Sequence, residues 1–296
     1  MSDSTAALRR KIDSAADLQS VVRTMKAMAA SNIGQYENAV RSLDGYYRNV
    51  QLGLAACFRQ GEAAGAARAE TAPAPAGAVY AVVFGSDQGL VGQFNETMVD
   101  FVAATLGQLS GRKVLWAVGQ RLQSRLAEAG LAPELDFSLP NSIDAITALV
   151  GQILLEIETR REKGRVARVL LFHHSPTTAQ ICTPVAQPLL PLDGAWRDGL
   201  AATPWPTKNL PEVVNGVAQT LPAFVREYLF VSLFRACAES LASENASRLA
   251  AMQRAEKNID ELLEDLNRSF HHLRQSGIDE ELFDVVSGFE ALTSAK

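Results

Sequence analysis

The residues best placed to bind a ligand form a glycine-rich loop in the middle of the chain. Residues 85–92 (GSDQGLVG) stand between the apolar run 79–84 and a following helical pattern, which is where a phosphate-binding loop lies in nucleotide-binding folds. The segment contains neither GxGxxG nor Gly-Lys-Ser/Thr. We therefore interpret it as a tight strand–helix turn in which Asp87 caps backbone amides, and we expect no cofactor.

Two pairs of adjacent histidines are the other candidates for chemistry. His173 and His174 fall in a strand-like run, where neighbouring side chains point to opposite faces of a sheet. His271 and His272 are adjacent in a helical pattern and also diverge. Neither pair predicts a metal site, and no Ser/His/Asp or Cys/His arrangement predicts a nucleophile. We expect no catalytic residue and no metal.

The bulk composition is that of an ordinary folded protein. Of its 296 residues, 47% are hydrophobic and 21% are charged, and the formal net charge of −5 speaks against a nucleic-acid partner. The sequence has no run of 18 apolar residues and no signal-peptide or transit-peptide pattern at its start. The three cysteines lie far apart, which predicts small buried hydrophobes rather than a disulfide framework: Cys57, Cys182 and Cys237.

The elements that must position these residues begin with a long helix. From residue 8 to residue 57, apolar residues recur at steps of three or four without a proline, as in the seam of a coiled coil. A helix of about 50 residues is roughly 75 Å long, so it must protrude or pair. The expected seam is Leu8, Ile12, Ala15, Leu18, Val22, Met25, Ala29, Ile33, Tyr36, Val40, Leu43, Tyr47, Val50, Leu54 and Cys57.

A second helical pattern occupies the C-terminal third of the chain. Pro211 fits an early helical position, and Pro222 predicts a kink or the true start of the helix. Residues 1–59 carry a net charge of +3 and residues 209–296 carry −6, which favours pairing of the two ends. The acidic run of this helix is interpreted as a solvated face: Glu256, Asp260, Glu261, Glu264 and Asp265.

Strand and helix patterns alternate between the two long helices, which predicts a mostly parallel sheet. The fold class is therefore α/β: a Rossmann-like α/β domain inserted into a long antiparallel coiled coil of the terminal helices. The predicted strands are 79–84, 113–118, 166–173 and 180–185, and the helices are 96–109, 120–129 and 142–163, followed by a connecting loop over 186–211. The predicted domains are an N-terminal helix (1–59), a linker (60–78), the α/β domain (79–208) and a C-terminal helix (209–296).

Three groups of residues, in the same order along the chain, resemble the gamma subunits of F-type ATP synthases. The first comprises LRRKI at 8–12 and TMKAMAAS at 24–31, and the second is SDQGLVGQFN at 86–95. The third comprises ASENASRLAAM at 242–252, RQSGI at 274–278 and VVSGFEAL at 285–292. The family usually has Cys at the position of Val91 and Gly at that of Gln93, so the resemblance is to a divergent branch, such as an alternative bacterial complex.

The resemblance implies a noncatalytic rotary shaft that couples rotation of the membrane c-ring to the nucleotide sites of alpha and beta subunits. It also implies contacts with the epsilon subunit and the c-ring, in a peripheral complex on the cytoplasmic face of a bacterial inner membrane. It assigns contacts with the alpha and beta subunits to Met25, Lys26, Arg274 and Gln275. The family-motif positions are Arg9, Asp87, Gly89, Glu244, Arg248 and Met252.

Each of the assigned contact residues also has a simpler structural interpretation. Met25 lies on the expected seam and can serve coiled-coil packing alone, whereas Lys26 lies one step off it and is expected to be exposed. Arg274 and Gln275 can be a solvated helix surface. For the whole chain, the alternatives are a coiled-coil scaffold and a nucleotide-binding α/β enzyme with a coiled-coil arm.

Overall fold

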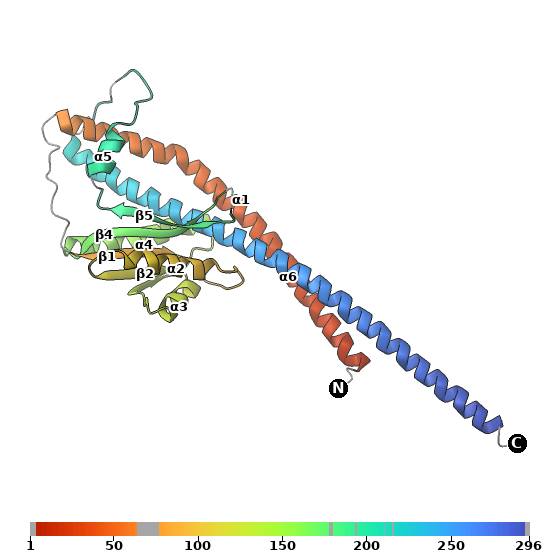
Figure 1. The fold of residues 1–296 in the computed structure, drawn as a ribbon. Helices are drawn as coiled ribbons and strands as arrows, with labels where there is room; N and C mark the ends of the chain where they lie inside the picture. Colours follow the sequence, from red (N-terminus) through yellow and green to blue (C-terminus); the bar gives the residue numbers. More distant parts are fainter. Residues whose placement is uncertain are drawn as a thin grey trace. The chain divides into compact units, whose positions relative to one another are not determined.

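The computed structural model describes residues 4–63, 77–177, 180–192, 194–209, 211–214 and 216–293. Two helices dominate it: α1 (Thr5–Ala63) and α6 (Val217–Thr293). The chain divides into two compact units, one formed by residues 1–28 with 249–296 and the other by residues 29–248. Both long helices pass through both units (Figure 1).

The two long helices run antiparallel within each unit. In the unit of the chain ends, Gln19 pairs with Asp260 and Arg23 with Glu256, so the residue number on α6 falls as that on α1 rises. In the larger unit, Asn32 pairs with Asn245 and Tyr46 with Glu227, in the same sense. This arrangement confirms the predicted α/β fold with two long terminal helices.

The inserted domain is built on a five-stranded sheet in the order β3-β2-β1-β4-β5. Its parallel strands are β1 (Ala78–Phe84), β2 (Lys113–Val118), β3 (Leu135–Phe137) and β4 (Val166–Ser175), and β5 (Thr183–Leu190) adds an antiparallel edge to β4. The connecting helices are α2 (Phe94–Gly107), α3 (Gln120–Glu128) and α4 (Ile143–Glu162), and a short α5 (Gly194–Ala201) follows β5.

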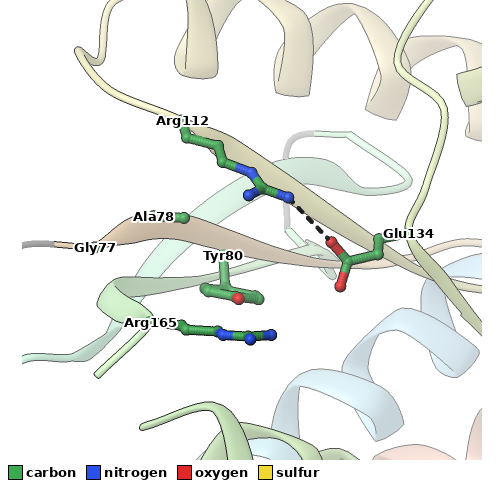
Figure 2. Close-up of a pocket in the computed structure, with 6 residues that line it drawn as sticks. All are labelled: Gly77, Ala78, Tyr80, Arg112, Glu134 and Arg165. Carbon is green, nitrogen blue, oxygen red and sulfur yellow. Dashed lines mark ion pairs between the residues drawn. The ribbon is translucent and has the colours of Figure 1, made fainter. Parts of the chain in front are cut away.

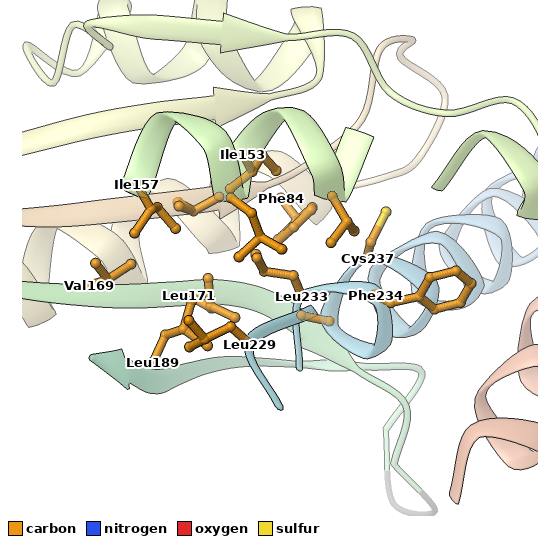
Figure 3. Close-up of a cluster of buried hydrophobic side chains, with 14 of the residues drawn as sticks. Phe84, Ile153, Ile157, Val169, Leu171, Leu189, Leu229, Leu233, Phe234 and Cys237 are labelled. Carbon is orange, nitrogen blue, oxygen red and sulfur yellow. The ribbon is translucent and has the colours of Figure 1, made fainter. Parts of the chain in front are cut away.

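Alternate residues of β1 enter two separate cores, because successive strand side chains point to opposite faces. Val79, Ala81 and Val83 pack with α2 and α3. Tyr80 and Phe84 pack on the other face with α4, α6 and α1. Figure 3 shows this second core, in which side chains of α4 and α6 meet above β4. Each fully buried Leu, Ile or Phe stabilises the layer by about 1.5–3 kcal/mol.

Element positions agree closely with the sequence pattern in the first half of the domain and less well after β4. The strand 113–118 coincides with β2, whereas the expected strand 180–185 is observed as β5 at Thr183–Leu190. The expected loop over 186–211 therefore contains the end of β5 and all of α5. The three-residue β3 was not predicted. Of the predicted linker, residues 64–76 lie outside the described part of the chain.

One expectation about the start of α6 is wrong, and so is one of the two alternatives for Pro222, that it marks the true start of the helix. Pro211 lies outside the helix, and the helix begins at Val217, five residues before Pro222. Gly216, with φ of +76°, precedes the first residue. Pro222 is tolerated inside α6 because it lies near the start, where the ring disturbs only a carbonyl of the first turn. Among the described residues no helix is long and apolar enough to cross a membrane.

Candidate functional site

The loop after β1 is closed by its own hydrogen bonds. The Ser86 backbone N–H donates to Asn95 Oδ1 at 3.1 Å, and the Asn95 amide donates back to Ser86 Oγ at 2.8 Å. Ser86 Oγ in turn donates to the Gln88 carbonyl at 2.8 Å. Ser86 and Asn95 are both buried, so their polar groups satisfy one another within the turn.

Asp87 caps a helix, as expected, but the helix is α3 rather than α2. Its Oδ1 accepts the backbone N–H of Gln120, the first residue of α3, at 2.9 Å. Gly119 lets the loop after β1 approach the start of α3, because a Cβ at this position would lie 2.8 Å from the Ser86 carbonyl oxygen. Gly89 is exposed, and a Cβ at this position would meet no atom within 4 Å. Nothing in the structure explains the glycine.

The motif 242–248 forms a junction at which α6 contacts two other parts of the larger unit. Ser243 Oγ donates to the backbone carbonyl of His174 at the end of β4, at 3.3 Å. Asn245 accepts a hydrogen bond from Asn32 of α1 at 3.3 Å and donates to the Leu241 carbonyl at 2.8 Å. Neighbouring residues of one helix thus fasten α6 to the sheet and to α1.

Glu244 and Arg248 form an ion pair inside this junction. Arg248 Nη2 donates to Glu244 Oε1 at 2.7 Å, and the two side chains are only 15% and 5% exposed, respectively. Burial raises the pKa of the Glu244 carboxyl, Arg248 opposes that rise, and the charge of Asp87 adds to it. Glu244 Oε2 is buried without a hydrogen-bond partner in the described part of the chain. Of the family-motif positions, these two are structural members of the junction.

The coiled-coil seam in the unit of the chain ends differs from the apolar pattern. Leu8 and Ala15 are buried as expected, but Leu18 is 58% exposed. Gln19 occupies the seam instead and donates to Asp260, while one heptad later Lys26 donates to Glu256. Two positions of the seam, seven residues apart, are therefore polar and bind acidic residues of α6.

Lys26 is consequently not the freely exposed cation that was predicted. Its side chain is 34% exposed and is ion-paired with Glu256, which also accepts from Arg23 Nε at 3.0 Å. These two hydrogen bonds hold the pKa of the Glu256 carboxyl below its usual range. Glu256 itself is only 17% exposed, so the acidic face of α6 is in part an interhelical contact rather than a wholly solvated surface.

The remaining motif and contact positions fall into two groups. Met252 is buried and Met25 is partly buried. Arg9, Arg274 and Gln275 are exposed, and no ion pair or hydrogen bond holds the side chain of Arg274 to another described residue. The structure therefore does not bring Met25 and Lys26 together with Arg274 and Gln275 into one concave site.

A polar network that the sequence did not reveal joins three elements of the larger unit. His173 Nε2 of β4 lies 3.2 Å from Glu239 Oε2 of α6, and Arg235 Nε donates to the other Glu239 oxygen at 2.8 Å. Arg235 Nη1 also reaches Asp44 of α1 at 3.2 Å. Although burial raises the pKa of Glu239, the bonds from His173 and Arg235 lower it to about 2. The four-residue spacing of Arg235 and Glu239 is a sequence signal, but it does not identify His173.

Other ligand-binding chemistry is limited in the described part of the chain. No group of three or more His, Cys, Asp or Glu residues there could hold a metal ion. His174 stacks on Phe94, with ring centroids 4.0 Å apart. Cys57 and Cys237 are buried and Cys182 is partly buried, and all three are free thiols.

Curated relatives of similar sequence are ATP synthase gamma chains. One from Clostridium botulinum (strain Kyoto / Type A2) is 27% identical over 214 residues, covering 71% of each chain. One from Nitratidesulfovibrio vulgaris (strain DSM 19637 / Miyazaki F) is 29% identical over 224 residues, covering 70% of this chain and 71% of the relative.

Solved structures share the fold. A chain of the Euglena gracilis mitochondrial ATP synthase, from its OSCP/F1/c-ring structure, aligns with a TM-score of 0.69 at 15% identity, over 99% of this chain and 95% of that one. A chain of the Tetrahymena thermophila central stalk and c-ring aligns with a TM-score of 0.54 at 22% identity, over 79% and 99%. Because the family model described as ATP synthase matches residues 4–292, nearly the whole chain, this chain belongs to the ATP synthase family.

Proposed function

We propose that this chain is the central rotary shaft of an F-type ATP synthase. In this role it couples ion-driven rotation of a membrane c-ring to ATP synthesis or hydrolysis at sites that belong to alpha and beta subunits. The chain supplies no catalytic residue; its part is mechanical. The observation that carries the proposal is a long helical end whose apolar side chains are left exposed by the described part of the chain.

That uncovered end follows from the length of the two helices. Gln19 faces Asp260 in an antiparallel pair, so facing residue numbers add to about 279 and Thr5 faces about residue 274. Beyond that point α6 has no described helix beside it. The exposed fractions there are 50% for Ile278, 61% for Leu282, 73% for Phe283 and 72% for Val285. Such apolar surface indicates a protein partner.

The N-terminal helix presents a second uncovered face in the same unit. Leu18, Val21 and Met28 are 58%, 55% and 62% exposed and lie outside the seam through Gln19 and Lys26. A ring of alpha and beta subunits around the paired helices would cover both surfaces. The inserted α/β domain and the adjoining parts of the long helices would then contact the epsilon subunit and the c-ring.

Within this proposal, four residues contact the alpha and beta subunits: Met25, Lys26, Arg274 and Gln275. Arg274 offers several donors and Gln275 both a donor and an acceptor, and both are exposed on α6. Lys26 would act together with Glu256, because an acidic partner has to compete with the bond that the two already form.

The coupling mechanism requires only that the shaft makes different contacts with each of the surrounding beta subunits. The two faces of the helix pair differ in sequence, so each beta subunit around the shaft meets a different surface. Turning the shaft changes the contact free energy at each site, which shifts the conformational equilibrium and hence the nucleotide affinity there. The proposed location is a peripheral complex on the cytoplasmic face of a bacterial inner membrane.

The test is assembly with the catalytic subunits. The full chain is co-expressed with the alpha and beta subunits from the same genome, with an affinity tag on beta only. We expect a complex that retains this chain and hydrolyses ATP, whereas alpha and beta without it show at most a small fraction of that rate. A tagged complex that excludes the chain, or an ATPase rate that does not depend on it, would contradict the proposal.

A further inference from the structure

A pocket of about 480 Å³ opens at the edge of the sheet where the parallel strands begin. Its lining comes from residues just before or at the start of four strands: Gly77, Ala78, Tyr80, Arg112, Glu134 and Arg165. This edge is opposite to the one that carries the 85–92 loop, because β1 runs from the pocket to the loop. The volume is in the range of pockets that hold small organic molecules.

The charges of the pocket favour an anion. Glu134 is already neutralised, because Arg160 Nη2 lies 3.0 Å from one of its oxygens and Arg112 Nη2 lies 3.7 Å from the other. Arg112 is 77% exposed and keeps most of its donors free. Arg165 is exposed, and its side chain has no ion pair or hydrogen bond with another described residue. Two guanidinium groups are therefore available at one opening.

The backbone at Gly77 and the ring of Tyr80 shape the wall of the pocket. A Cβ at Gly77 would lie 2.8 Å from the Arg165 carbonyl oxygen, so only glycine lets these segments approach so closely. Tyr80 packs its ring edge-on against Trp116, with centroids 5.3 Å apart. In Figure 2 the Tyr80 ring is seen between the side chains of Arg112 and Arg165.

The Tyr80 hydroxyl is a third free donor. The residue as a whole is only 4% exposed. The hydroxyl nevertheless makes no hydrogen bond with another described residue, and it is not among the fully buried atoms that lack a partner. Its oxygen therefore has access to the pocket that the residue lines. A buried phenol with an accessible, unused donor complements the two arginines.

We propose that this pocket binds a small organic anion that bears phosphate or carboxylate groups. Arg165 and Arg112 take the anionic oxygens, since the guanidinium fork matches the geometry of both groups. Tyr80 donates one further hydrogen bond and selects a ligand with an acceptor deep in the pocket. This site is separate from the helix surfaces assigned to the alpha and beta subunits, and binding of a small anion goes beyond the role of a shaft.

The test is calorimetric titration of the full chain with two probes, inorganic phosphate and citrate, at matched ionic strength. We expect saturable binding of at least one probe below about 10 mM, and a chloride titration that gives none. Arg165→Ala is expected to weaken binding about tenfold, the loss of a charge-assisted hydrogen bond, and Tyr80→Phe several-fold. The control is Arg161→Ala, an exposed arginine of α4 outside the lining, which should leave the affinity unchanged.

Two results would overturn the proposal. One is the absence of saturable binding for both probes. The other is equal affinity in the wild type, Arg165→Ala and Tyr80→Phe, which would place any bound anion elsewhere on the surface. Thermal unfolding of each variant shows whether the fold is retained, and Arg165→Lys, which keeps the charge but not the fork, should bind between the wild type and Arg165→Ala. Assembly with alpha and beta subunits is measured separately, so failure here leaves the shaft role untouched.

Discussion

Two neighbouring histidines of β4 lie in different environments, because adjacent strand residues face opposite sides of the sheet. His173 contacts Glu239 at 3.2 Å on the face that packs against α6. His174 is only 1% exposed and stacks on Phe94 of α2. Burial, and after it the charge of His173, lowers the pKa of His174 to about 4. His174 is therefore a neutral ring at physiological pH.

The depressed pKa of His174 predicts a loss of stability in mild acid. The unfolded chain binds this proton below about pH 6.5, whereas the folded chain binds it only below about pH 4, so stability falls as the pH drops between these values. The loss is of order 3 kcal/mol. We expect His174→Phe, which can keep the stacking, to flatten this part of the profile, as measured by urea unfolding at several pH values. His271→Phe, at an exposed histidine of α6, is the control and should not.

Glu256 holds two cations of α1, and its contact with Lys26 makes a second prediction at the scale of single residues. Lys26→Glu would place two carboxylates together in the unit of the chain ends. We expect the midpoint of thermal unfolding to fall by at most a few degrees, since the pair is partly solvated. The charge swap of Lys26→Glu with Glu256→Lys should restore most of the loss. A midpoint equal to that of the wild type in Lys26→Glu alone would contradict this role.

At the scale of elements, α6 is the part to which the others are fastened. Ser243 binds the end of β4, Asn245 binds α1, and Glu239 joins His173 through one oxygen while Arg235 holds the other. Arg235 extends the same network to Asp44 of α1. These contacts lie within three turns of the helix.

The Glu239 network predicts a second acid transition at lower pH. The pKa of Glu239 is about 2 in the folded protein, against about 4.3 when unfolded, so its contribution is complete above the unfolded value and is lost as the pH falls through the folded one. We expect Glu239→Gln to destabilise the protein by about 2 kcal/mol at neutral pH. The mutant should also lose the pH dependence between about pH 4.3 and 2. Glu212→Gln, at an exposed site, is the matched control in the same unfolding titration.

The sequence predicted elements well where one physical signal determines them. The strand 113–118 coincides with β2 because it is a buried apolar run. The apolar pattern alone places Leu18 in the seam, whereas Gln19 and Lys26 occupy it through hydrogen bonds to acidic residues of α6. β3 has only three residues, too few to show a pattern. The Glu239 network joins residues 66 positions apart, which no local spacing reveals.

At the scale of the whole molecule, one long helix serves two purposes. In the larger unit, α6 is buried by the sheet and by α1 and carries the polar junction. In the unit of the chain ends, the same helix pairs with α1 through charged residues and then continues with exposed apolar side chains. A central-stalk subunit needs both properties, since the part that is fastened and the part that contacts the catalytic subunits must move together.

The contact role of the helix end makes the last prediction. Arg274 and Gln275 are exposed where the helix pair ends, and the Arg274 side chain has no ion-pair or hydrogen-bond partner among the described residues. Replacing both with Ala should therefore leave the free chain as stable as the wild type. In a reconstituted complex we expect normal assembly but ATPase turnover reduced about tenfold or more, because a hydrogen bond to a charged group contributes about 1.5–3 kcal/mol. The control is Arg268→Ala, which removes a cation already paired with Asp265 and should leave turnover close to that of the wild type. Equal turnover in the double mutant and the wild type would contradict the contact role and would mean that Arg274 and Gln275 are only a solvated helix surface.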